Sequence, residues 1–88
     1  MARVTAFELP GIDCWFHSQD HGPPHFHAKK AGVWEVRVFF LKRVESMIEV
    51  KWKRGFLGGR ETKPLCAMAE ACRAELLREW EEKVQPDA

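Results

Sequence analysis

The sequence lacks several features that would assign it to a broad class of proteins. No segment approaches the roughly 18 apolar residues that a membrane-spanning helix needs, and the first residues contain no apolar run typical of a signal peptide. We therefore expect a soluble, cytoplasmic protein that does not enter a membrane. The formal net charge is only +1, which excludes a strong overall attraction to nucleic acid or anionic lipid and leaves electrostatic binding to local patches.

Cysteine is also scarce, and its spacing excludes two common roles. The chain has 3 cysteines, an odd number that cannot form a closed set of disulfides. Cys66 and Cys72 would lie on different faces of a helix, too far apart to bridge. No C-x-x-C spacing occurs, so a zinc site built from cysteine has no support. We expect free, mostly buried thiols in a reducing compartment.

The chain does have enough apolar residues for one core, since 45% of its 88 residues are hydrophobic, and we expect a single domain over residues 1–88. Apolar and polar residues alternate in five segments, which predicts strands at residues 3–8, 12–17, 25–29, 33–41 and 47–53. Their period of two predicts an inward-facing apolar set: Ile12, Cys14, Phe16, Phe26, Val36, Val38, Ile48, Val50 and Trp52.

The period of the apolar residues changes in the last third of the chain. Leu65, Met68, Cys72, Leu76 and Trp80 recur at spacings of three and four, as on one face of an amphipathic helix. We expect this helix to end near residue 84, with a proline in its first turn at position 64 and a threonine cap at position 62. The predicted fold is α+β: a small, mainly antiparallel sheet of four to five strands with one long C-terminal helix packed on one face.

All 4 histidines fall in one short segment, HSQDHGPPHFH, at residues 17–27. If the strands on either side of its proline turn form a hairpin, His17, His25 and His27 project from the same outer face of the sheet, and Asp20 and His21 lie in the loop above them. Neutral imidazole and carboxylate together suit zinc, nickel, copper or iron(II), and we favour zinc or nickel. The candidate metal ligands are Asp20, His21, His25 and His27, with His17.

Two other interpretations of this histidine segment stay open. In the first, the imidazoles and Asp20 only form hydrogen bonds that stiffen a proline turn. In the second, His25 and His27 are a catalytic acid and base acting on a phosphodiester, as in a toxin-like ribonuclease. The phosphate contacts would then come from Lys29, Arg37 and Lys51.

The segment DHGPPHFHA resembles the D-H-x-P-P-H-x-H signature of the bacterial domain of unknown function 4160, and ELLREWEE is similar to the closing helix of that family. His17 lies outside the signature. Members of the family are small prokaryotic proteins often encoded beside another small domain, so the resemblance implies a toxin–antitoxin or related accessory pair. It places the signature on Asp20, His21, Pro23, Pro24, His25 and His27.

These observations together predict a small accessory domain that holds a divalent metal on its His/Asp cluster. We expect it to act through a protein partner or on nucleic acid, because so short a chain has little room for a deep substrate pocket. A homodimer is a further expectation, since the run Phe39-Phe40-Leu41 places apolar side chains on both faces of the sheet. A structural module whose sheet edge pairs with another chain is the remaining alternative.

Overall fold

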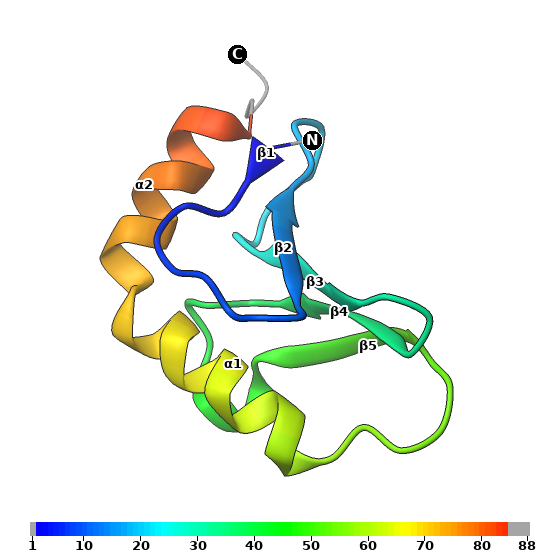
Figure 1. The fold of residues 1–88 in the computed structure, drawn as a ribbon. Helices are drawn as coiled ribbons and strands as arrows, with labels where there is room; N and C mark the ends of the chain where they lie inside the picture. Colours follow the sequence, from blue (N-terminus) through cyan, green and yellow to red (C-terminus); the bar gives the residue numbers. More distant parts are fainter. Residues whose placement is uncertain (1, 85–88) are drawn as a thin grey trace.

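The computed structural model describes residues 2–84. They form a five-stranded sheet, and Figure 1 shows the helices along one side of it. The elements, in chain order, are β1 (Ala2–Arg3), β2 (Asp13–Phe16), β3 (Phe26–Lys30), β4 (Trp34–Val38), the short 3-10 helix η1 (Val44–Ser46), β5 (Ile48–Lys53), α1 (Gly59–Ala71) and α2 (Arg73–Lys83).

The sheet is a simple antiparallel meander. Its strand order is β1-β2-β3-β4-β5, so each strand pairs with its neighbours in sequence. One cross-strand row runs through Arg3, Trp15, His27, Arg37 and Glu49, which are paired in register across all five strands. Residues paired in this way project from the same face of a sheet. The predicted α+β fold with an antiparallel sheet is confirmed.

The first predicted strand, residues 3–8, is wrong beyond its first residue, Arg3. Strand β1 ends at Arg3, and the chain then leaves the sheet and runs beside α2. The backbone N–H groups of Thr5 and Ala6 donate to the carboxylate of Glu79, at 2.8 and 2.7 Å. A buried side chain from the other end of the molecule thus replaces the ladder partner that a strand would need.

The single long helix is also wrong, because two helices meet at Cys72. This residue has φ −106° and ψ 21°, outside the helical range. The bend is fixed by contacts on both sides of it. Arg73 donates to the backbone oxygens of Phe40 and Lys42, at 2.7 and 2.8 Å, and the Cys72 thiol lies 3.8 Å from the oxygen of Ala6. Because the axis changes direction at this bend, α1 and α2 each pack their own buried residues against the core.

The start of the helical segment differs as well. Helix α1 begins at Gly59, after Gly58 as the N-cap, so Pro64 lies inside the helix and not in its first turn. Thr62 does not cap the helix. Its hydroxyl donates instead to the oxygen of Gly58, 3.4 Å away.

The core lies between the sheet and the helices and largely follows the predicted inward set. Phe16, Phe26 and Val36 are fully buried. Trp52 is an exception. A bulge shifts the register between Glu35 and Val36, so Trp52 pairs with Glu35 and its indole projects from the outer face of the sheet. Val50 keeps the inward phase but is 44% exposed at the edge of the sheet.

The run Phe39-Phe40-Leu41 is mostly accommodated within the chain. Phe40 is fully buried. Phe39 packs against His25, with ring centroids 5.0 Å apart, and Lys42 lies over its ring. Leu41 is 48% exposed, so it is the one member that still argues for the homodimer, which stays a prediction.

The three cysteines are free, as expected, but only Cys66 is buried; Cys14 and Cys72 are half-buried. Burial raises the pKa of the Cys14 thiol to about 12, which leaves it protonated and unreactive near neutral pH. Within residues 2–84, no helix is long and apolar enough to cross a bilayer.

Candidate metal centre

The site is formed by the loop between β2 and β3 and by the start of β3. A turn at residues 17–20 brings the carboxylate of Asp20 back toward the sheet. The backbone N–H of Asp20 donates to the oxygen of His17 at 3.1 Å, and the backbone N–H of His17 lies 3.4 Å from Asp20 Oδ2. Pro23 and Pro24 then end this loop, because proline cannot donate to a strand ladder.

His27 lies on the outer face of β3, opposite Trp15 on β2. Its ring stacks on the Trp15 indole, with centroids 5.4 Å apart and an interplanar angle of 18°, and the residue is only 2% exposed. His27 Nε2 lies 2.8 Å from Asp20 Oδ2. Burial lowers the pKa of His27 below its ordinary value, although the hydrogen bond and charge of Asp20 oppose this shift.

His25 lies just before β3 and is held from three sides. Its ring packs between Phe39 and Trp80, with centroids 5.0 and 5.5 Å away. Its Nδ1 lies 2.9 Å from the backbone oxygen of Pro23. A carbonyl oxygen can only accept, so Nδ1 carries the proton and donates. In the neutral form of this ring the other nitrogen, Nε2, is an acceptor, and it faces Asp20 Oδ2, 3.4 Å away.

Two acceptors therefore face each other in a largely buried place, and this arrangement calls for a cation between them. Either a second proton on His25 or a metal ion would provide the positive charge between these two atoms. One ligand atom each from Asp20, His25 and His27 lie within 4.8 Å of one another. A zinc ion about 2.0–2.1 Å from each ligand places neighbouring ligand atoms on the order of 3 Å apart, which the 2.8 and 3.4 Å separations approach.

The two histidine ligands differ in whether a hydrogen bond to their second ring nitrogen would orient them for a metal. The hydrogen bond from His25 to Pro23 is the kind of outer contact that orients a metal-bound imidazole. His27 Nδ1, in contrast, is buried and has no hydrogen-bond partner among the described residues. A metal on His27 Nε2 would leave an unpaired N–H at this atom, so one ligand is well oriented and the other is incompletely supported.

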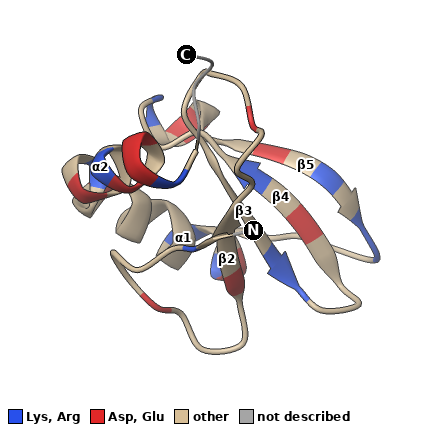
Figure 2. Cartoon of the chain, turned by 90° about the horizontal axis from the view of Figure 1, so that it is seen from above, with Lys and Arg blue, Asp and Glu red and all other residues tan. Residues whose placement is uncertain are grey.

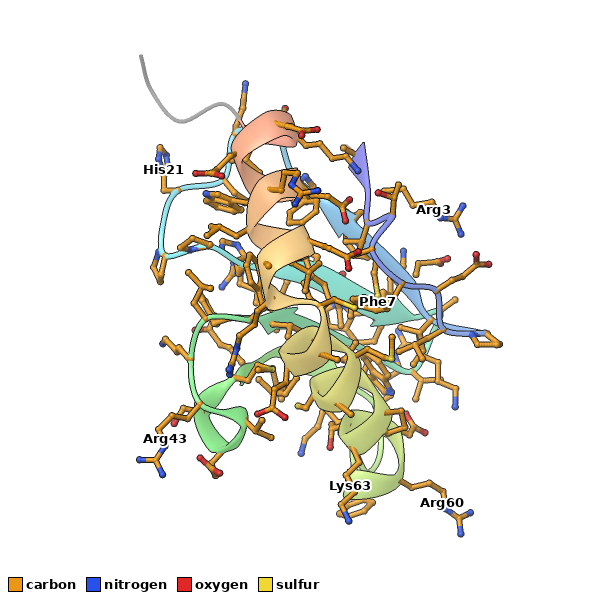
Figure 3. The ribbon with its side chains drawn as sticks, turned by 90° about the vertical axis from the view of Figure 1, so that its left-hand side faces the viewer. Arg3, Phe7, His21, Arg43, Arg60 and Lys63 are labelled. Carbon is orange, nitrogen blue, oxygen red and sulfur yellow. The ribbon has the colours of Figure 1, made fainter. Side chains whose placement is uncertain are left out.

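The structure brings together three of the five predicted ligands. His21 is exposed and points away from the body of the molecule (Figure 3). His17 is also exposed; its Nε2 accepts the indole N–H of Trp15 at 3.2 Å, and its ring contacts His27 edge-on. Neither belongs to the cluster of Asp20, His25 and His27.

Sequence reasoning missed the residues that enclose the cluster. Trp15 alternates with the inward residues of β2, so its place beside His27 was available from the pairing of the two strands. Phe39 and Trp80 gave no such signal, since their contacts with His25 depend on how the end of β4 and the helix α2 meet the loop.

The cations that were predicted to contact phosphate mostly interact with other side chains of the chain. Arg37 pairs with Glu49 at 2.5 Å, and Lys51 pairs with Glu35 at 3.3 Å. Lys29 lies over the Trp15 ring, with its Nζ 5.7 Å from the centroid. The outer face near the histidines is thus a surface of alternating, paired charges.

Comparison with known proteins gives one finding. The model of a family described as "Domain of unknown function (DUF4160)" matches residues 11–81, which include the whole loop, the sheet from β2 onward and most of both helices. No curated protein and no solved structure matches the chain.

Proposed function

The chain belongs to the DUF4160 family, and from the geometry of its loop we propose that it is an accessory domain that holds a divalent transition metal. The ligands are Asp20, His25 and His27. The observation that carries the proposal is the pair of facing acceptors, His25 Nε2 and Asp20 Oδ2, with the tautomer of His25 set by Pro23. Two nitrogens and one carboxylate oxygen are a donor set that zinc and nickel accept.

A structural role for the ion follows from the burial of its ligands. The side chains of His25 and His27 are 8% and 3% exposed, and that of Asp20 is 17% exposed. A metal there would tie the loop to β3 and leave little room for a substrate. The function we propose is therefore to stabilise a recognition surface that acts through a partner macromolecule.

A metal-free role is the second candidate, and one observation favours it. Asp20 and Pro23 already accept hydrogen bonds from His27 and His25, so these contacts alone could stiffen the loop. The ribonuclease hypothesis gains no such support, because the two imidazoles are buried and a catalytic acid and base must reach the substrate. A toxin–antitoxin pair and a homodimer remain expectations.

Calorimetric titration of protein without a histidine tag, with zinc and then nickel near neutral pH, tests the proposal. We expect one equivalent to bind with moderate affinity, because His27 Nδ1 lacks a partner. The His25→Ala, His27→Ala double variant should lose this binding. His21→Ala is the matched control, since this imidazole lies outside the cluster, and it should bind as the parent does.

The metal-free role predicts the opposite pattern. The parent protein then binds no stoichiometric metal, and the double variant is destabilised by roughly 1–3 kcal/mol through lost hydrogen bonds. Titration without heat, together with a melting temperature that submillimolar zinc leaves unchanged, would remove the metal from the proposed function.

A further inference from the structure

The net charge of the chain is small, but its acidic and basic residues are unevenly distributed along the sequence. Residues 51–63 contain five lysines and arginines and a single acidic residue, whereas residues 70–83 contain five glutamates and three basic residues. Figure 2 shows acidic positions along α2 and basic positions toward the end of β5. We call four exposed cations the basic end: Lys53 and Arg54 at the end of β5, and Arg60 and Lys63 near the start of α1.

The cations of the basic end are free to meet a ligand. All four are exposed, and Arg60 and Lys63 extend away from the body of the molecule at the end opposite His21 (Figure 3). Within the part of the chain that the structure describes, none of the four forms an ion pair. The nearby Glu61 does not neutralise them, because it accepts hydrogen bonds from Lys30 and Trp34.

An exposed aromatic ring lies between these cations in the sequence. Phe56, in the loop between β5 and α1, is 88% exposed, the highest value among the exposed large apolar residues. Its ring lies over Gly58, where a Cβ would collide with it. Trp52 is half-buried on the outer face of the sheet, next to Lys53 in sequence. Phe56 thus lies between the two pairs of cations along the chain, whereas Trp52 projects from the face of the sheet opposite to Lys53.

We propose that the basic end and Phe56 bind single-stranded nucleic acid, independently of the metal site. Phosphates contact the four cations, and one base stacks on the Phe56 ring. Positive side chains interleaved with exposed aromatic rings are how proteins bind single strands without reading their sequence. Stacking requires a base that is not already stacked, so a single strand fits this surface better than a duplex does.

A lipid surface and an acidic protein fit the same region less well. Insertion into a bilayer needs a sizeable apolar face, but Leu57 beside Phe56 is half-buried and Trp52 belongs to the sheet face, so only one ring projects. An acidic protein would satisfy the cations but would leave Phe56 exposed unless it also offered an apolar pocket. A nucleotide supplies both a phosphate and a flat ring in one repeating unit.

Fluorescence anisotropy with a labelled oligouridylate of about 12 nucleotides tests the proposal. Phe56→Ala and Phe56→Leu should each weaken binding about tenfold, whereas Phe56→Trp should keep it, because only an aromatic ring stacks. Arg54→Gln with Arg60→Gln should reduce the slope of log affinity against log salt by about 1.4, since each phosphate contact on a single strand contributes about 0.7. Arg78→Gln, an exposed change on α2, is the matched control and should alter neither quantity.

The exposure of these side chains means that the variants should fold, which circular dichroism and a melt would verify. The proposal is overturned if the parent protein fails to bind the oligonucleotide at about 50 mM salt, where such contacts are strong. It is also overturned if Phe56→Leu binds as tightly as the parent, if a duplex of equal length binds more tightly, or if anionic phosphatidylglycerol vesicles or polyglutamate bind where the oligonucleotide does not.

Discussion

The Oε1 atom of Glu79, near the end of α2, lies 2.8 Å from the backbone nitrogen of Thr5, near the start of the chain. The other oxygen of the same carboxylate accepts from the N–H of Ala6, and Lys83 lies 2.5 Å from Oε1. Although burial alone would raise the pKa of Glu79, the hydrogen bonds from Lys83, Thr5 and Ala6 hold it below its usual value. One ionised side chain thus joins the two ends of the fold.

Glu79→Ala should destabilise the protein by roughly 2–3 kcal/mol, because it removes a charged acceptor and leaves partly buried N–H groups unpaired. Urea denaturation near neutral pH measures the change. Glu82→Ala, an exposed substitution on the same helix, should stay within about 0.5 kcal/mol of the parent. Equal losses in the two variants would mean that the N-terminal segment does not depend on Glu79.

Acid should destabilise the metal-free protein in two ranges of pH. Burial lowers the pKa of His27, so the unfolded chain takes up the proton first, and the contribution of this residue is lost as the pH falls below about 6.5. Glu79, whose pKa is also lowered, loses its contribution further down, as the pH falls through the acidic range. Each group contributes a slope of at most about 1.4 kcal/mol per pH unit.

Denaturation at several pH values, with a chelator present, checks the His27 contribution. The His27→Gln variant should show a flatter dependence between pH 7 and 5 (roughly the range in which histidine titrates). His21→Gln should keep the slope of the parent, because this side chain is exposed in both states. A parent protein equally stable at both ends of this range would contradict the buried, neutral state of His27.

Zinc affinity should fall as the pH falls below about 7, because a protonated imidazole cannot bind the metal. The lowered pKa of His27 moves the part of the fall due to this residue to lower pH. With His25 and His27 both bound, the logarithm of the affinity should approach a slope of about two per pH unit below the imidazole pKa values. Titration against a competing chelator at each pH gives the slope. An affinity that does not vary with pH would exclude the histidines as ligands.

Trp80→Ala should cost on the order of 3–5 kcal/mol, the usual range for removing a large buried aromatic residue. Trp80 is 8% exposed and contacts Phe16 and His25, so the same variant should also weaken zinc binding. Thermal melting and the zinc titration measure the two effects. Leu41→Ala, at a 48% exposed position, is the control; a Trp80 variant that melts within a few degrees of the parent would show that α2 does not anchor the core.

The sheet could be predicted because alternation is a local signal and each strand pairs with its neighbour in sequence. The bend at Cys72 could not, since the apolar stripe continues through it from Met68 to Leu76 and the cause lies in contacts with distant backbone oxygens. Similarly, the pattern at residues 3–8 suits a strand, and nothing nearby indicates that Glu79 takes the place of one.

The candidate site shows the same limit at a smaller scale. Clustering in sequence identified five potential ligands, but it could not separate His25 and His27 from His17 and His21. The separation comes from the turn that directs Asp20 toward the start of β3 and from Trp15, which engages His17 elsewhere. These are properties of the folded loop.

The order in which the elements follow along the chain bears on how the protein emerges from a ribosome. Every ladder of the meander is complete once Lys53 has been made, so the hairpins can assemble one after another during synthesis. The backbone N–H groups of Thr5 and Ala6, which follow β1, have no partner until Glu79 leaves the exit tunnel. This segment is therefore the last of the described chain to settle, and it stays open to proteases and chaperones until α2 has been made.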